Sequence, residues 1–264
     1  EFLEYDIAKL IVELNTPKKP VLGLMSTLPM APDYNPQTGQ QREGWVILSQ
    51  LQQLFTVQNI STTADSIPAE VNVLMVVHPK ELQDRTLYAI EQYLMRGGHA
   101  LVFVDPRSEN DPAGQQNTQM YGPGGQQDPY AAMMAPRHSS LGKLFTAWGV
   151  EFDTTQITSD IENALAVGSP MGQPVRHLGY IGMGKDALSR QDVVTGSIDT
   201  INFATPGSIK LSDKSTLTLE PLVQTSAEAG LIPAEKFMMM GMMGDPSSLR
   251  ADYKAGGERK VIAA

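Results

Sequence analysis

Two residue pairs in the first half of the chain could do chemistry: His78 with Pro79, and Asp105 with Pro106. A histidine beside an aspartate can act as a general base, because the carboxylate orients and stabilises the imidazole. The same pairs are also ordinary ways to end a strand, since proline has no backbone N–H to donate to a sheet. Arg107 follows the second pair. We take His78, Pro79, Asp105 and Arg107 as candidate contacts for a ligand or partner.

The segment between the pairs predicts a strand, a helix and a second strand. Residues 71–77 are apolar and β-branched, as in a strand buried on both faces, and residues 101–104 repeat the pattern. Asp84 is the expected N-cap of a helix over residues 84–96, and Gly97 with Gly98 forms its expected exit. Parallel strands joined by a helix would place both pairs at the carboxyl ends of the sheet, where open α/β sheets bind ligands.

Familiar catalytic and cofactor motifs are absent from the sequence. It contains no Walker-type phosphate loop, no G-x-S-x-G nucleophile elbow and no H-E-x-x-H metal motif. It also contains no cysteine, which excludes disulfides, thiolate metal sites and cysteine nucleophiles. We therefore expect no metal, no cofactor and no enzymatic activity. A hydrolase-like enzyme that uses His78 and Asp105 is the alternative.

Charge and hydropathy limit the classes of partner. The 20 basic and 29 acidic residues give a net charge of −9 at pH 7, whereas nucleic-acid binding needs a cationic face. No run of 18 or more apolar residues is present, so no segment of this chain is expected to span a bilayer. The chain starts without Met and stops within an apparent strand, so we expect a fragment of a longer protein whose membrane segments lie elsewhere.

Alternating strand and helix patterns predict a doubly wound α/β sheet. Strands are expected at residues 20–26 and 56–60, with a helix over residues 44–55 between them. After the central unit, a helix over residues 139–148 and a strand over residues 152–158 follow. We expect a parallel sheet with strand order 2-1-3-4 and helices divided between its two faces.

The predicted domain division separates an α/β core from a β-rich extension. The core covers residues 1–160 and carries a flexible insertion at residues 107–138, which is rich in Gly, Gln, Pro and Met. Residues 161–264 form the extension of the same domain, and they include a methionine cluster at 237–244 that is core filler or a tail segment. The strands expected in the extension lie at residues 164–167, 177–183, 193–211 and 215–225.

The sequence VNVLMVVHPKELQDRTLYAIEQYLMRGGHALVFVDP, residues 71–106, resembles the signature region of auxiliary components of ABC transporters associated with bacterial gliding motility. Their soluble domain is related to part of intraflagellar transport proteins. Residues 201–210 (INFATPGSIK) and 221–226 (PLVQTS) resemble two later motifs. The resemblance implies a flavodoxin-like sheet, akin to class I glutamine amidotransferases, held outside the cytoplasm by flanking membrane helices. It supplies no catalytic residues to carry over.

Together, these observations lead to the hypothesis of a non-catalytic, extracytoplasmic (periplasmic) domain of an inner-membrane ABC-transporter auxiliary protein. Its expected partner is the permease and ATPase complex or another envelope protein. A pure assembly module, in which the sheet serves only as a scaffold, stays open as a third hypothesis.

Overall fold

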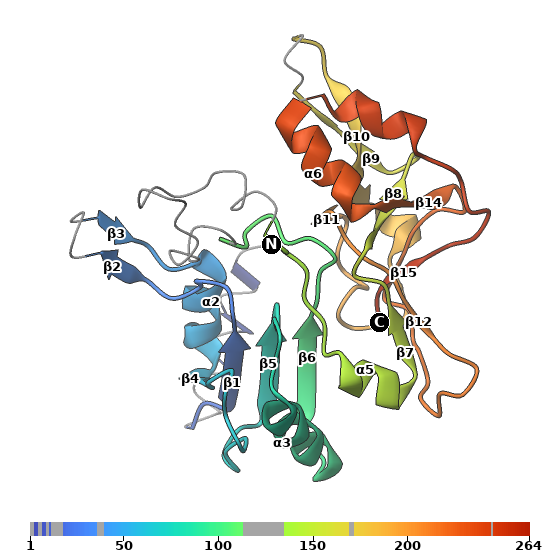
Figure 1. Ribbon diagram of the computed structural model, residues 1–264. Coiled ribbons are helices and arrows are strands. Elements are labelled where there is room, and N and C mark those ends of the chain that lie inside the picture. The colour runs from blue at the N-terminus through green and yellow to red at the C-terminus, as the bar shows by residue number, and fades with distance from the viewer. Residues whose placement is uncertain are drawn as a thin grey trace, which may run out of the picture. The chain divides into compact units, whose positions relative to one another are not determined.

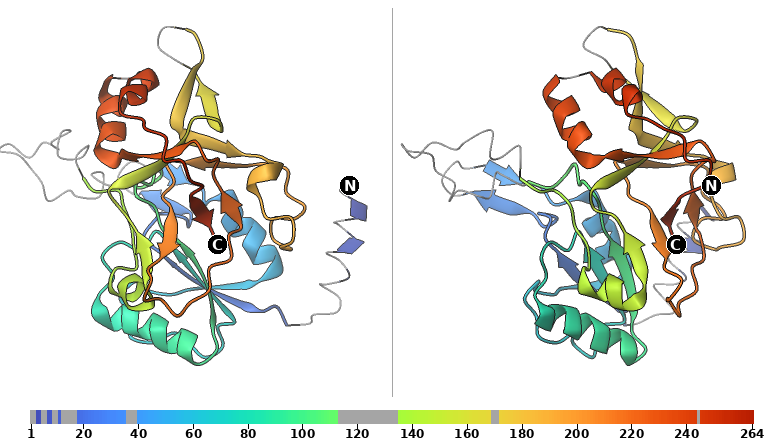
Figure 2. Two further views of the ribbon diagram at one scale, coloured as in Figure 1. Left: turned by 90° about the vertical axis from the view of Figure 1, so that its right-hand side faces the viewer. Right: turned by 45° about the vertical axis from the view of Figure 1, so that its right-hand side comes forward.

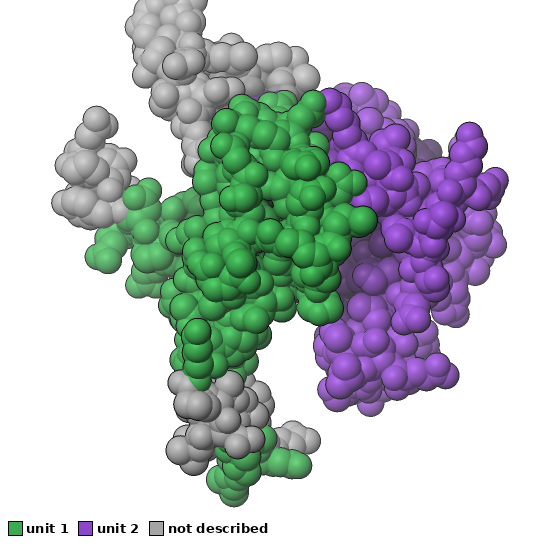
Figure 3. Space-filling model, turned by 90° about the horizontal axis from the view of Figure 1, so that it is seen from below, with its two compact units in different colours: residues 1–103 green, residues 104–264 purple. Residues whose placement is uncertain are grey.

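The computed structural model describes residues 3–4, 7–8, 11, 18–35, 40–112, 135–168, 172–243 and 245–264. The chain divides into two compact units, residues 1–103 and residues 104–264 (Figures 1 and 3). None of the helices in the described part of the chain has the length and apolar character that crossing a bilayer requires.

Unit 1 is built on a four-stranded parallel sheet (Figure 1). Its strands are β1 (Val21–Ser26), β4 (Thr56–Asn59), β5 (Val73–Val77) and β6 (His99–Phe103), in the order β4-β1-β5-β6. This is the predicted order 2-1-3-4, and β5 and β6 pair in parallel as expected. The predicted α/β sheet is therefore confirmed, while its flavodoxin-like assignment stays a prediction.

Two helices cover opposite faces of this sheet (Figure 2). Helix α2 (Val46–Leu54) buries Leu48 against alternate residues of the strands, among them Leu24 and Met75. Helix α3 (Asp84–Met95) lies on the other face, where the Tyr93 hydroxyl donates to the carbonyl of His99 over 3.3 Å. The helices alternate between faces because right-handed crossovers run in opposite directions from the central strands.

Local details of unit 1 correct two expectations. Gln83, not Asp84, is the N-cap of α3, and Asp84 instead places its carboxylate in the positive first turn. Strand β6 was expected to be buried on both faces, but Leu101 is 49% and Phe103 45% exposed. The reason is that β6 is an edge strand with one neighbour. The polar segment before α2 contains a short antiparallel hairpin of β2 (Asp33–Asn35) and β3 (Gln40–Arg42). The left-handed exit at Gly97, with φ of 87°, is confirmed.

Unit 2 consists of small antiparallel sheets, in the orders β11-β10-β9, β13-β15-β12-β7 and β14-β8. A short helix opens it and a longer one lies near its end (Figure 1). Its elements are α5 (Lys143–Trp148), β7 (Val150–Phe152), β8 (Gln156–Asp160), β9 (Ala164–Val167), β10 (Val175–Met183), η1 (Lys185–Ala187), β11 (Ile201–Ala204), β12 (Ile209–Leu211), β13 (Val223–Gln224), β14 (Ala229–Pro233), α6 (Ala234–Met243), η2 (Pro246–Ala251) and β15 (Val261–Ala263).

The core of unit 2 forms where α6 covers strands β8 and β10. Phe237 of α6 is 1% exposed and packs in one cluster with Ile157 and Leu178. The methionine-rich segment is thus part of a helix, and its first residue fills the core. Met239 on the same helix is 51% exposed, so the helix does not bury every methionine.

Several predicted strands of unit 2 are shorter than expected. The strand predicted at residues 152–158 is divided into β7 and β8, because Asp153 turns the chain by accepting hydrogen bonds from the N–H and hydroxyl of Thr155. Residues 193–211 hold only β11 and β12, and residues 215–225 only β13. Strands β7 and β8 pair antiparallel with later strands of unit 2 instead of extending the parallel sheet. The domain limits at 160 and 161 stay a prediction.

The predicted insertion at residues 107–138 is described only at its two ends, and residues 113–134 lie outside the described part. The ends are joined, because the Ser108 N–H donates to the carbonyl of Arg137 over 2.8 Å. Ser139 and Asp105 pair through the Ser139 N–H and the Asp105 carbonyl, also over 2.8 Å. The Ser139 hydroxyl accepts from the Asp105 N–H, so it does not cap α5, which begins only at Lys143.

Candidate functional site

His78 lies directly after β5, at the carboxyl edge of the parallel sheet. Its side chain is fully buried, and its backbone has a φ of 51°, in the left-handed region. The His78 N–H donates to the Phe103 carbonyl over 2.8 Å, and its own carbonyl accepts from the Thr27 hydroxyl. Pro79 is buried as well. These contacts tie the end of β5 to both neighbouring strands, which is a structural role.

Asp105 and Arg107 belong to unit 2, whereas His78 and Pro79 belong to unit 1. The predicted pairing of His78 with Asp105 therefore stays a prediction. In unit 2, the backbone N–H and the backbone carbonyl of Asp105 both form hydrogen bonds with Ser139. Arg107, in contrast, enters a polar cluster that the sequence did not predict.

Arg107, Glu109 and Thr205 form the centre of this cluster. The Arg107 Nε lies 3.3 Å from Glu109 Oε1, and both side chains are largely shielded, with 17% and 32% exposed. The Thr205 hydroxyl donates to the Arg107 carbonyl over 2.8 Å. Thr205 is fully buried with a φ of 48°, which is strained for a β-branched residue. The surrounding bonds must therefore hold this backbone in place.

His177 and Tyr180 on β10 lie within the electrostatic reach of Glu109. Their rings stack with centroids 3.8 Å apart. Burial lowers the pKa of His177 below its ordinary value, although the Glu109 carboxylate acts in the opposite direction. Burial, followed by the same carboxylate, raises the pKa of Tyr180. His177 is thus a neutral, buried ring at pH 7.

A cavity of about 500 Å³ opens beside Arg107 in unit 2. Its charged lining comes from Arg107, Arg137 and Glu235, while Met238 and three prolines supply apolar surface. Two of the segments that line the cavity are joined to each other, because the Ala234 N–H at the start of α6 donates to the Thr155 carbonyl over 2.8 Å. Chemically, the cavity can accept an anionic group.

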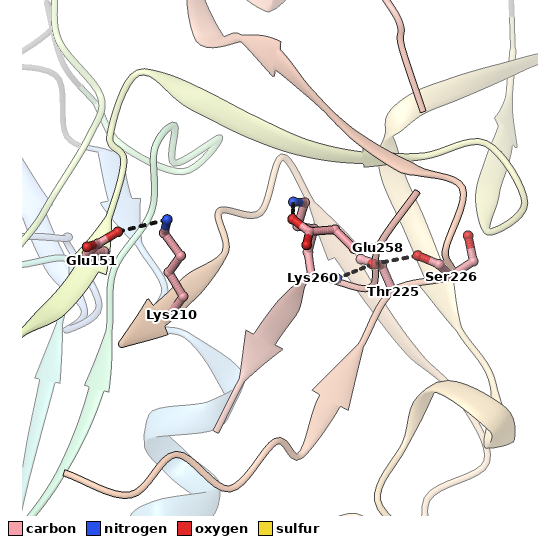
Figure 4. Close-up of polar contacts among 6 residues, drawn as sticks. All are labelled: Glu151, Lys210, Thr225, Ser226, Glu258 and Lys260. Atoms are coloured by element: carbon pink, nitrogen blue, oxygen red, sulfur yellow. Dashed lines mark hydrogen bonds and ion pairs between the residues drawn. The ribbon is translucent and has the colours of Figure 1, made fainter. Parts of the chain in front are cut away.

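Two ion pairs lie among the residues that line a second cavity of unit 2, of about 910 Å³ (Figure 4). Lys210 Nζ lies 2.9 Å from Glu151 Oε2, and Lys260 pairs with Glu258. The hydrogen bond that Lys210 donates to the Glu151 carboxylate raises the pKa of Lys210. Because these cations already have carboxylate partners, they are better suited to joining strands than to holding a ligand.

Asp160, at the end of β8, is a fully buried carboxylate that organises the chain around it. It accepts hydrogen bonds from the backbone N–H groups of Glu162 and Asn163, from the Asn163 amide, and from both the N–H and the hydroxyl of Ser226. Burial alone would raise the pKa of Asp160, but the bonds from Asn163 and Ser226 together lower it. Its role is structural.

Sequence reasoning selected Arg107 but missed Glu109, Arg137, His177 and Thr205. His177 was missed because only the fold brings it close to Glu109. The one available signal was the INFATPGSIK motif, which contains Thr205. Within the described residues, no group of three His, Asp or Glu side chains is placed to hold a metal ion.

One family model, described as an ABC-type uncharacterized transport system, matches residues 19–264. The match runs through both compact units. No curated protein and no solved structure matches the chain.

Proposed function

Because the chain belongs to this family of ABC-type transport systems, we propose that it is the ligand- or partner-binding part of a transporter's auxiliary protein, outside the cytoplasm. The family match over residues 19–264 carries the proposal. The matched residues include both the parallel sheet and the polar cluster, so the proposed role in transport applies to both compact units. The resemblance of residues 71–106 supports the further proposal that the parent protein is one of the auxiliary components associated with gliding motility.

The proposed role is non-catalytic, and the burial of His78 supports it. A general base must come within hydrogen-bond reach of the proton it removes. His78 is 0% exposed, and its backbone is committed to the neighbouring strands. The hydrolase-like alternative would need this side chain to leave its site before it could act.

The proposed partner is the permease and ATPase complex of the transporter, or another envelope protein. Membrane helices of the parent protein, outside residues 1–264, would hold the chain against that complex. The net charge of −9 agrees with a protein partner and disfavours nucleic acid.

A cysteine-accessibility experiment tests the location, because residues 1–264 contain no cysteine and any cysteine elsewhere in the gene product can first be replaced by serine. Val193 is 92% exposed, so Val193→Cys in the full gene product should react with a membrane-impermeant maleimide in intact spheroplasts. Ala229, which is 0% exposed, gives the matched buried control, Ala229→Cys, which should react only after denaturation. Reaction of Val193→Cys only after lysis would contradict an extracytoplasmic location.

A hydrolase screen tests the non-catalytic part of the proposal. We expect no turnover of ester, amide or phosphate substrates by the wild-type chain. A turnover lost in both His78→Ala and Asp105→Asn, with melting temperatures unchanged, would establish the enzyme alternative instead. A lost general base typically lowers the rate by a factor of about 10² or more.

A further inference from the structure

The cavity of about 500 Å³ in unit 2 has the size of a small-molecule site. Such sites commonly measure roughly 300–1,000 Å³ and combine apolar walls with a few fixed polar groups. This cavity is lined by residues from four separate stretches of the chain, including both ends of the predicted insertion and the start of α6. The fold, and not one local loop, therefore creates it.

Two arginines give the cavity its chemical character. Arg107 is held by Glu109 through Nε, and the two terminal nitrogens of its guanidinium can donate to another acceptor. Arg137 lines the cavity as well. A guanidinium fork matches the oxygens of a carboxylate or phosphate. An anionic group in the cavity would therefore meet two guanidinium groups.

The remaining lining restricts the shape and charge of such a ligand. Pro106, Pro136, Pro233 and Met238 supply apolar surface beside the arginines. Glu235, which is exposed at the start of α6 and lines the cavity, would repel a second negative charge on the ligand. The cavity thus fits a molecule with one anionic head and an apolar body.

We propose that this cavity binds a small organic anion, whose carboxylate or phosphate is held by Arg107 and Arg137 and whose apolar body packs on the prolines and Met238. The inference names a ligand class for the proposed binding role and rests on that role for its biological setting. Neither a cofactor nor a metal ion is needed for it.

Calorimetric titration of the 264-residue chain tests the proposal with four probes: phenyl phosphate, phenylacetate, inorganic phosphate and neutral benzyl alcohol. We expect phenyl phosphate or phenylacetate to bind at one site with a Kd on the order of 1 mM, and both reference compounds to bind more weakly. Whichever of phenyl phosphate and phenylacetate binds more tightly identifies the preferred anionic head group. The titration with inorganic phosphate shows how much of the affinity depends on the apolar body of the ligand.

Matched variants locate the binding. Arg137→Gln should weaken the preferred anion about tenfold, and Arg137→Lys, which keeps the charge but loses the fork, should weaken it less. Arg250→Gln makes the same chemical change at an exposed position outside the cavity and should leave the Kd unchanged. Glu235→Gln should bind the anion at least as tightly as wild type, because it removes the repulsion.

Three results would overturn the proposal: no binding of either anion, equal affinity of Arg137→Gln and wild type, or equal affinity for benzyl alcohol. Melting curves of each variant show whether the fold is kept, and Arg137→Lys provides the comparison if Arg137→Gln does not fold. These results are independent of the maleimide experiment. If no anion binds in the titration while Val193→Cys is labelled in intact spheroplasts, the anion site is rejected and the proposed location is kept.

Discussion

Replacing Asp160 with asparagine measures how much a single buried carboxylate contributes to the stability of unit 2. In the structure, Oδ2 accepts from the Ser226 N–H over 2.7 Å and from the Asn163 amide over 2.8 Å. Oδ1 accepts from two further backbone N–H groups and from the Ser226 hydroxyl. An asparagine can keep its oxygen at one of these positions, so its NH₂ group must face donors at the other.

The expected cost follows from the bonds lost. With the asparagine oxygen at the Oδ1 position, two hydrogen bonds to a charged acceptor disappear, and two donors are left without a partner. A hydrogen bond to a charged group contributes about 1.5–3 kcal/mol, so we expect a loss of about 3 kcal/mol or more in the free energy of unfolding. Small domains are stable by only about 5–15 kcal/mol, so this is a large fraction.

Tryptophan fluorescence can assign the loss to the correct unit. Trp148 lies in unit 2 and Trp45 in unit 1, and the chain has no other tryptophan. Urea unfolding followed by Trp148 in a Trp45→Phe background should shift to lower urea in Asp160→Asn. The exposed Asp213 provides the control, and Asp213→Asn should change the stability by less than about 0.5 kcal/mol.

The pH dependence gives a second check on the same carboxylate. The folded-state pKa of Asp160 is lowered, so its contribution to stability is present above the ordinary value of 3.8 and is lost as the pH falls through the folded pKa. The gap between wild type and Asp160→Asn should therefore narrow in acid. A gap below about 0.5 kcal/mol at pH 7, or one that widens in acid, would refute the reasoning.

Three further predictions concern the core and the polar cluster of unit 2. Gly179→Ala should lower the free energy of unfolding by about 1–3 kcal/mol in a urea melt, because the added Cβ would collide with the ring of Phe237. An unchanged urea midpoint would show that the ring can move to make room. Thr205→Val and Thr205→Gly both lose the hydroxyl bond, but only glycine relieves the left-handed strain. In urea unfolding, the valine variant should therefore be less stable than the glycine variant by about 1–2 kcal/mol, and equal stabilities would contradict the strain. The pKa of His177 is lower in the folded chain than its ordinary value of 6.5, so the unfolded chain binds the proton more readily. The free energy of unfolding should therefore fall as the pH drops below 6.5. Melts of His177→Phe between about pH 5 and 8 should lack this part of the fall in stability.

The sequence predicted the sheet of unit 1 well because local signals agreed with one another there. A β-branched run, a helix with a glycine exit and a second apolar run specify a right-handed crossover, which leaves little freedom of strand order. The same signals could not show that β6 lies at an edge, since that depends on which strands follow it in space. Leu101 and Phe103 therefore looked buried but are partly exposed.

Unit 2 was predicted less well because its strands are short and pair over long separations. Residues 215–220 alternate as a strand should, yet they form none, since no neighbouring strand pairs with them. The polar cluster joins residues that are nearly one hundred positions apart, such as Arg107 and Thr205. No local pattern announces such contacts, and only Arg107 could be selected from its position after a predicted strand.

Co-purification is the most direct test of the proposed role in transport. The full gene product, tagged and extracted from membranes with mild detergent, should bring with it an ABC permease and its ATPase in near-stoichiometric amounts. An unrelated tagged membrane protein of the same cell serves as the control. Recovery of the gene product from the soluble fraction, without either transporter subunit, would contradict the proposal.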